Sequence, residues 1–286
     1  MRTSKSTIAI VFVMLLVLFS CNKKENKIND ANFISGNMSN VSSGNKLLAH
    51  IPMPAKLDSA MRHSFDSVTY KILKNINPKN VKSFTISKDN YIKMIDDFPA
   101  NADRVAFSFV QFNKASFPAK YKELSKYDGC LYLVYYYMDS TGKNVGDKAY
   151  AMLGLPNIVE IDAADFDVMI NDYLKNIKSK IDNVVKGTQG NTLRVKIKKD
   201  ELLAYKARIS TKKDIKNFKI TLAQWVDYSN YITKNEKGLL MNRLSQFSPD
   251  SQGQMTFITD CKSTSGGDVQ DLSGSELQPF CPNDCP

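Results

Sequence analysis

Apolar residues recur at helical spacing in three stretches of the chain and form shorter dense runs between them. The helical pattern covers residues 57–76, 88–98 and 166–184, where apolar residues return every third or fourth position. It predicts an amphipathic helix in each stretch, and Ser87 is a suitable N-cap for the second. Runs rich in β-branched and aromatic residues predict strands, which cover 105–112, 131–138, 149–153, 193–198 and 255–259.

Weaker patterns assign the remaining elements of the second half. Residues 202–209 are predicted as a further strand, and residues 239–247 as a helix. Thr221 and Gln224 fit a capping box for another helix, which would carry Trp225. We therefore expect an α+β fold in which helices pack on mainly antiparallel strands.

A repeat is visible when residue n is compared with residue n + 134. Residues 81–92 then align with residues 215–226. The identical pairs are Lys82/Lys216, Phe84/Phe218 and Ile86/Ile220. In both copies an extended segment would lead into a capped helix. Two interpretations stay open: an internal duplication that gives two related units, or two similar helix entries.

The first residues of the chain have the order of an export signal. Arg2 and Lys5 precede an unbroken apolar run at 8–19, and the small Ser20 is followed by Cys21. A twelve-residue helix rises about 18 Å, which is too short for a hydrocarbon core of about 30 Å. The segment is therefore expected to be a signal peptide. Its end resembles the lipobox of bacterial lipoproteins, and the alternative is an ordinary cleaved signal with an incidental cysteine.

The lipobox resemblance implies that Cys21 becomes the N-terminus and carries acyl chains, palmitate among them. More than one acyl chain gives stable membrane anchoring. Asn22 follows the cysteine in place of the aspartate that often retains such proteins in the inner membrane, so we expect the outer membrane, at its periplasmic face or the cell surface. The expected regions are a signal peptide at 1–20, a tether at 21–50, a first α+β unit at 51–190, a second at 191–262 and a tail at 263–286.

The end of the chain carries a second resemblance. The sequence Asp139-Ser-Thr-Gly142 fits a turn between two strands, and residues 280–286 read Phe-Cys-Pro-Asn-Asp-Cys-Pro. Together with the extended entry into an aromatic-bearing helix, these features resemble a loose group of secreted lipoproteins of the Bacteroidota. No activity is attached to that group. The resemblance therefore implies a cell-envelope location and a non-catalytic function.

Four cysteines remain besides Cys21, namely Cys130, Cys261, Cys281 and Cys285. An even number in an exported chain suggests up to two disulfide bonds, with three ways to pair them. A local Cys281–Cys285 bond would leave Cys130 with Cys261, and Cys261 could equally bind one of the last two. The chain has one closely spaced Cys pair and no Cys-x-x-Cys, so neither a zinc site nor redox chemistry is expected.

Positive charge is concentrated in residues 186–219, which hold eleven Lys or Arg and three acidic residues. Alternation on the strand predicted at 193–198 puts Arg194, Lys196 and Lys198 on one face. The functional hypothesis is a surface for an acidic polysaccharide, lipopolysaccharide phosphates or anionic lipid. The alternative is a solvated face whose lysines protect a sheet edge. Nucleic acid is not expected as a partner of an exported protein.

Motifs of metal, elbow-serine and phosphate-loop enzymes do not occur in the sequence, and no cofactor is expected. Asp162, Asp165 and Asp167 cluster where the helix at 166–184 begins, and they complement its dipole. The leading hypothesis is a lipid-anchored, non-catalytic binding or accessory protein of the cell envelope, which would meet an anionic glycan, a lipid surface or an envelope protein. The alternative is an envelope hydrolase whose carboxylates converge only in the fold.

Overall fold

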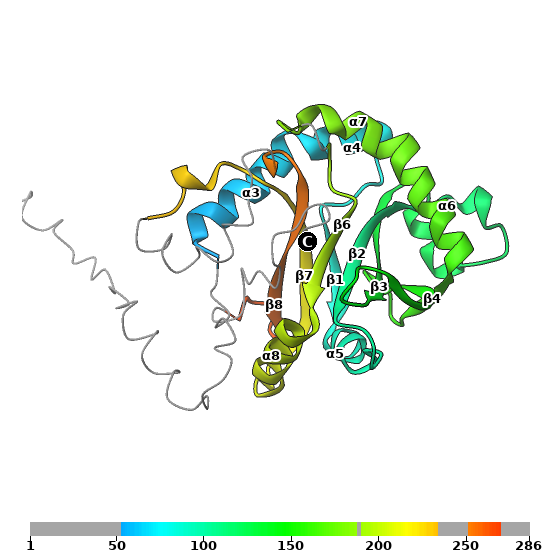
Figure 1. The fold of residues 1–286 in the computed structure, drawn as a ribbon. Helices are drawn as coiled ribbons and strands as arrows, with labels where there is room; N and C mark the ends of the chain where they lie inside the picture. The colour runs from blue at the N-terminus through cyan, green and yellow to red at the C-terminus, as the bar shows by residue number, and fades with distance from the viewer. Residues whose placement is uncertain (1–52, 188–189, 234–250, 270–286) are drawn as a thin grey trace, which may run out of the picture. The chain divides into compact units, whose positions relative to one another are not determined.

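Two antiparallel sheets form the centre of the computed structural model, which describes residues 53–187, 190–233 and 251–269 (Figure 1). The larger sheet has the order β5-β4-β3-β2-β6, and its strands are β2 (Arg104–Gln111), β3 (Leu131–Met138), β4 (Asn144–Ala151), β5 (Val159–Asp162) and β6 (Arg194–Lys198). The smaller sheet has the order β1-β7-β8, with β1 (Ser83–Ser87), β7 (Ile215–Gln224) and β8 (Met255–Ser263). All paired strands are antiparallel, which confirms the predicted α+β fold.

The three predicted amphipathic helices are confirmed, and the first and third are irregular. The first is divided into α3 (Ala55–Ser67) and α4 (Thr69–Ile76) at Val68, whose φ of −119° and ψ of −80° are not helical. The second is α5 (Lys88–Asp96). The third runs through α6 (Ala163–Tyr173), a π turn (Leu174–Lys178), α7 (Ser179–Ile181) and a 3-10 turn (Asp182–Val184). Further 3-10 turns span Lys114–Ser116, Lys122–Tyr127 and Tyr228–Asn230.

Aromatic contacts join the layers around one large hydrophobic core. Phe107 of β2 and Phe257 of β8 meet edge to face at 5.3 Å between ring centroids, which joins the two sheets. Phe166 of α6 packs on Tyr136 of β3 at 5.3 Å. On the far side of the smaller sheet, α3 buries Met61 against β7 and β8. The helices α3 and α6 thus cover different sheets (Figure 1).

Three strands pass into helices without a connecting loop. The residues at these junctions are Ser87, Asp162 and Lys198, with φ from −62° to −71° and ψ from 146° to 150°. An extended N-cap residue lets the strand direction turn into a helix within one residue. The predicted cap is confirmed at Ser87, whose Oγ accepts a hydrogen bond from the Asn90 N–H at 3.2 Å.

The strand predicted at 202–209 is wrong, because this segment belongs to helix α8 (Lys199–Ser210). Leu202, Tyr205 and Ile209 are its buried residues, and their spacing of three and four positions is helical. In a strand these three could not share one face.

The helix predicted around Trp225 is also wrong. Thr221 and Gln224 lie in β7, which pairs with β1 on one side and β8 on the other. Two neighbouring strands satisfy the backbone groups of β7, so the local capping signal has no helix to cap. The Gln224 side chain instead accepts a hydrogen bond from the Thr69 hydroxyl at 2.6 Å.

The alignment at n + 134 pairs segments that are neighbours in a sheet rather than equivalents. β1 and β7 run antiparallel, so Phe84 lies opposite Ile220, and Ile86 lies opposite Phe218. A different correspondence relates α4-β1-α5-β2 to α7-β6-α8-β7 near n + 111, and it continues from β3 to β8 at n + 124. The two halves exchange their first strands, since β6 pairs with β2 and β1 pairs with β7. Each sheet is therefore completed by the other half of the chain.

Several expectations fall outside the described residues. These are the signal peptide and Cys21, the tether, the helix predicted at 239–247, and the tail cysteines Cys281 and Cys285. Within the described ranges, no helix combines the length and the apolar character that a bilayer crossing requires.

Candidate functional site

The predicted basic face on β6 is largely covered. Register places Lys196 opposite Ala106, which lies opposite Tyr136, and Tyr136 packs under α6. Lys196 is therefore only 8% exposed. Val195 and Ile197, which lie between the three basic residues, are also buried.

The expectation of one exposed basic row is wrong, because the same face packs against α6. Arg194 is half-buried and donates a hydrogen bond from Nη1 to the Tyr136 hydroxyl at 3.0 Å. Lys198, at the end of the strand, is exposed. Two of the three candidates thus lie against the molecule, and Lys198 alone points to an open surface.

The two described cysteines are buried and are not bonded to each other. Cys130 lies just before β3, and burial raises the pKa of its thiol. Cys261 lies in β8, where its Sγ is 2.8 Å from the Tyr205 hydroxyl. The pairings that involve Cys281 or Cys285 stay predictions, because those residues lie outside the described ranges.

Two of the three clustered aspartates join a surface network at the start of α6. Lys120 Nζ lies 2.7 Å from Asp165 Oδ2 and 3.3 Å from Asp162 Oδ2, and Lys148 pairs with Asp162. The Tyr121 hydroxyl donates to Asp165 at 2.6 Å. Each carboxylate is therefore neutralised by at least one ammonium group.

The electrostatics of this network favour charged carboxylates. Hydrogen bonds from Lys120 and then Tyr121 lower the pKa of Asp165, and hydrogen bonds from Lys148 and then Lys120 lower the pKa of Asp162. Burial, followed by the hydrogen bond to Asp165, raises the pKa of Tyr121 to about 12. Tyr121 also has a φ of +54°, a left-handed backbone that costs a non-glycine residue energy. The network holds this turn against α6, and a low pKa is unsuited to a general acid.

A shallow, open groove of about 750 Å³ runs along the outer side of α3. Small side chains of α3 line one wall, and Val226 and Tyr231, which follow β7, line the other. The α3 residues of the groove are Ala55, Lys56, Ser59, Ala60, His63, Ser64 and Ser67. In the sequence, this groove corresponds to small residues that recur at helical spacing on the polar face of α3. The stronger apolar periodicity of the same helix predicts only its buried face.

The helix that forms the groove wall packs on a buried hydrophobic cluster. Beneath α3, a second hydrophobic cluster contains Leu57, Met61 and Trp225, all less than 3% exposed. Arg62 fixes the helix to β8 through two hydrogen bonds to Asp260, at 2.8 and 3.1 Å. A third, to Asp58 of α3 itself at 2.6 Å, orients the guanidinium group. These contacts position the wall of small side chains independently of any ligand.

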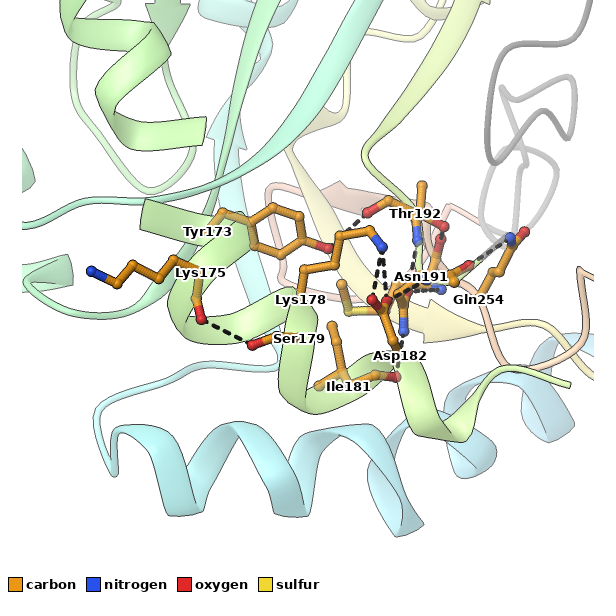
Figure 2. A network of polar contacts seen from close by, with 11 residues as sticks. Tyr173, Lys175, Lys178, Ser179, Ile181, Asp182, Asn191, Thr192 and Gln254 are labelled. Atoms are coloured by element: carbon orange, nitrogen blue, oxygen red, sulfur yellow. Dashed lines mark hydrogen bonds and ion pairs between the residues drawn. The ribbon is translucent and has the colours of Figure 1, made fainter. Parts of the chain in front are cut away.

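Figure 2 shows a polar network at the end of α7. Lys178 pairs with Asp182 at 2.9 Å, and Asp182 accepts the Asn191 N–H at 2.6 Å. The Tyr173 hydroxyl donates to the Thr192 carbonyl at 2.7 Å. These hydrogen bonds join α7 to β6 and β8, and the Gln254 side chain donates from its amide to the Gly190 carbonyl at 2.9 Å.

Neither the search for a metal site nor the comparisons with known proteins indicates a function. Within the part of the chain that the structure describes, no three His, Cys, Asp or Glu side chains are arranged to hold a metal ion. Comparisons of the chain with protein-family models, curated proteins and solved structures gave no match.

Proposed function

We propose that the protein is a lipid-anchored, non-catalytic binding protein of the bacterial cell envelope. The anchor is Cys21, and the described fold begins with α3 at Ala55. About thirty residues lie between them, and a flexible segment of that length reaches about 30 Å. The folded part thus stays close to the membrane while its surfaces face envelope partners.

The groove along α3 is the observation that supports binding. It is open and shallow, and its walls combine small side chains with the aromatic Tyr231. Such a surface suits an extended chain that lies along the helix, either a polysaccharide or a segment of an envelope protein. Lys56 and His63 border the groove, so an acidic chain is the better complement.

Two of the clustered aspartates, Asp162 and Asp165, are unsuited to the acid role that the alternative of a hydrolase requires. A glycosidase needs one carboxyl group whose pKa is raised, so that it can act as an acid. Asp162 and Asp165 have the opposite shift, since lysines hold both in the charged form. They are consequently assigned to the structure of the α6 start rather than to catalysis.

Anchoring is tested by the Cys21→Ser variant in a bacterial host with lipoprotein processing. The wild-type chain should partition into detergent and show an intact mass with acyl groups beginning at Cys21. The variant should stay unprocessed or appear in the soluble fraction. A wild-type mass without acyl groups would refute the anchor.

Binding is tested by filling the groove. Ser59→Trp puts a large side chain on the groove wall, and Ala207→Trp, on the exposed side of α8, is the matched control. Both variants and the wild type are passed over immobilised envelope polysaccharides and envelope proteins. Loss of a retained partner with Ser59→Trp, but not with Ala207→Trp, supports the groove. Equal retention of all three proteins contradicts it.

A further inference from the structure

Two segments, each made of helical turns and the residues that follow them, concentrate positive charge. Residues 69–82 and residues 174–187 together contain eight lysines and one acidic residue, Asp182. The lysines are Lys71, Lys74, Lys79, Lys82, Lys175, Lys178, Lys180 and Lys186. We call these two segments the lysine face. Its net charge is +7.

The fold brings the two segments together. Helix α4 contacts α7, and the two lie next to each other in Figure 1. Each precedes the first strand of its half, so both lie at the starts of β1 and β6. The other ends of these strands lead into α5 and α8, which carry five basic and four acidic residues. Charge is therefore separated between the two ends of the strands.

Most of these lysines are available to a partner. Lys71, Lys79, Lys175, Lys180 and Lys186 are exposed, and none has an ion pair within the described residues. Lys82 pairs with Asp66 at 2.7 Å, with both side chains more than 40% exposed. Lys74 and Lys82 also lie 5.4 and 4.9 Å from the ring centroid of Tyr70. The lysine face thus keeps its charge at the surface.

We propose that the lysine face rests on the anionic headgroups of the membrane to which the protein is anchored. This proposal rests on the proposed function, because the anchor keeps the folded part within reach of that membrane. Basic residues near an anionic bilayer are attracted through their charge alone, without a shaped pocket. The lysines are distributed over two neighbouring segments. This arrangement suits an extended anionic surface better than a single bound phosphate group. The anchor would then hold the protein near the surface, while the lysine face would set its orientation.

The test uses the chain from residue 21 on, carrying Cys21→Ser, which contains every described residue and lacks lipid. Binding is measured by co-sedimentation with vesicles of phosphatidylcholine that contain about 30 mol % phosphatidylglycerol, and with pure phosphatidylcholine. The face variant replaces four exposed lysines by Gln: Lys71, Lys79, Lys175 and Lys180. The control replaces four exposed lysines elsewhere: Lys122, Lys198, Lys213 and Lys216. Both variants lose the same charge.

The face variant should bind the anionic vesicles at least about tenfold more weakly than the parent, and the control less than about threefold more weakly. Binding should be absent on pure phosphatidylcholine and should weaken between about 50 and 500 mM salt, because exposed charges are screened. Equal losses in both variants would overturn the proposal. Binding to a soluble acidic polysaccharide without binding to the vesicles would also overturn the proposal. Because this chain carries no lipid, a failed anchor and a failed lysine face give separate results.

Discussion

Asn80 and Asn191 make the same buried hydrogen bonds in the two halves of the fold. The Asn80 Oδ1 accepts the N–H of Leu131, the first residue of β3, at 2.8 Å. The Asn191 Oδ1 accepts the N–H of Met255, the first residue of β8, at 2.9 Å. Each amide also donates to the last turn of the preceding helical segment, Asn80 to the Leu73 carbonyl and Asn191 to that of Ile181. Each asparagine thus joins a helix end to the start of a distant strand.

A glycine next to each of these strands repeats the correspondence. Gly129 donates its N–H to the Phe112 carbonyl at 2.7 Å, and Gly253 donates to the Trp225 carbonyl at 3.0 Å. Both glycines have positive φ, at 70° and 95°. In each half an aromatic residue after the second strand meets a glycine before the third. These shared features indicate an internal duplication with exchanged first strands.

We expect Asn80→Ala and Asn191→Ala each to lower the free energy of unfolding by about 1–3 kcal/mol, because each leaves a buried strand N–H and a helix carbonyl unpaired. Urea denaturation of the purified variants measures this. Asn75→Ala, at an exposed position of α4, is the control and should change stability by less than about 0.5 kcal/mol. If either buried asparagine gave a loss as small as the control, the shared structural role would be refuted.

The loss of stability on replacing a glycine by alanine should depend on which atoms the added Cβ would contact. At Gly146 nothing lies within 4 Å, so Gly146→Ala carries only the left-handed backbone cost of about 1 kcal/mol. At Gly129 a Cβ would lie 2.8 Å from the Asn77 side-chain amide, which can move. At Gly253 it would lie 2.2 Å from the Val184 carbonyl oxygen, which belongs to the backbone.

Thermal unfolding should therefore give the smallest loss for Gly146→Ala, a larger one for Gly129→Ala and the largest for Gly253→Ala. The last should exceed about 3 kcal/mol or prevent folding, since a backbone segment must shift. Equal stability of the Gly146→Ala and Gly253→Ala proteins would show that the 184–185 segment does not pack against Gly253 as described.

The regular elements of the first half could be predicted because local and global signals agree there. The helix at 88–98 has both a cap at Ser87 and an apolar stripe, and the run at 131–138 is β-rich along its whole length. In the second half they conflict. Thr221 and Gln224 look like a helix start, yet β7 is fixed as a strand by two neighbours from distant parts of the chain. Sequence spacing contains no information about such neighbours.

The alignment at n + 134 is misleading for a related reason. Strands that pair antiparallel often carry similar apolar residues, so Phe84 and Ile86 resemble Phe218 and Ile220 although they lie across from them. The features that do correspond are single residues with special roles, such as Asn80 and Gly129, separated by variable loops. The basic residues of β6 can be recognised in the sequence by their charge. That α6 covers two of them depends on tertiary packing, which the sequence does not reveal. The lysine face depends on two helices that the fold brings together.

The surface network at the start of α6 predicts a measurable titration. Lys120→Gln should raise the pKa of Asp165 toward its ordinary value of 3.8, because the hydrogen bond from Lys120 is the largest cause of its depression. Carbon-13 NMR of the side-chain carboxyl follows this directly. Lys122→Gln, an exposed neighbour outside the network, is the control and should leave the Asp165 titration unchanged.

The sign of the pH effect on stability follows from the same shift. A carboxyl group whose pKa is lower in the folded state stabilises the fold above the unfolded value near 3.8, and this contribution is lost as the pH falls below it. Stability of the Lys120→Gln protein should therefore depend less steeply on pH in that acidic range than the wild type does. An unchanged Asp165 titration would mean that the ammonium contact does not form in solution.

The basic residues of β6 should contribute unequally to stability. Lys198→Gln should change the free energy of unfolding by less than about 0.5 kcal/mol, because its side chain is exposed. Arg194→Gln should cost about 1 kcal/mol, because it removes the hydrogen bond to the Tyr136 hydroxyl. Tyr136→Phe removes the same bond, so the double variant should lose less than the sum of the two single losses. Strict additivity in this cycle, or equal effects of Arg194→Gln and Lys198→Gln, would show that β6 presents its basic side chains to solvent after all.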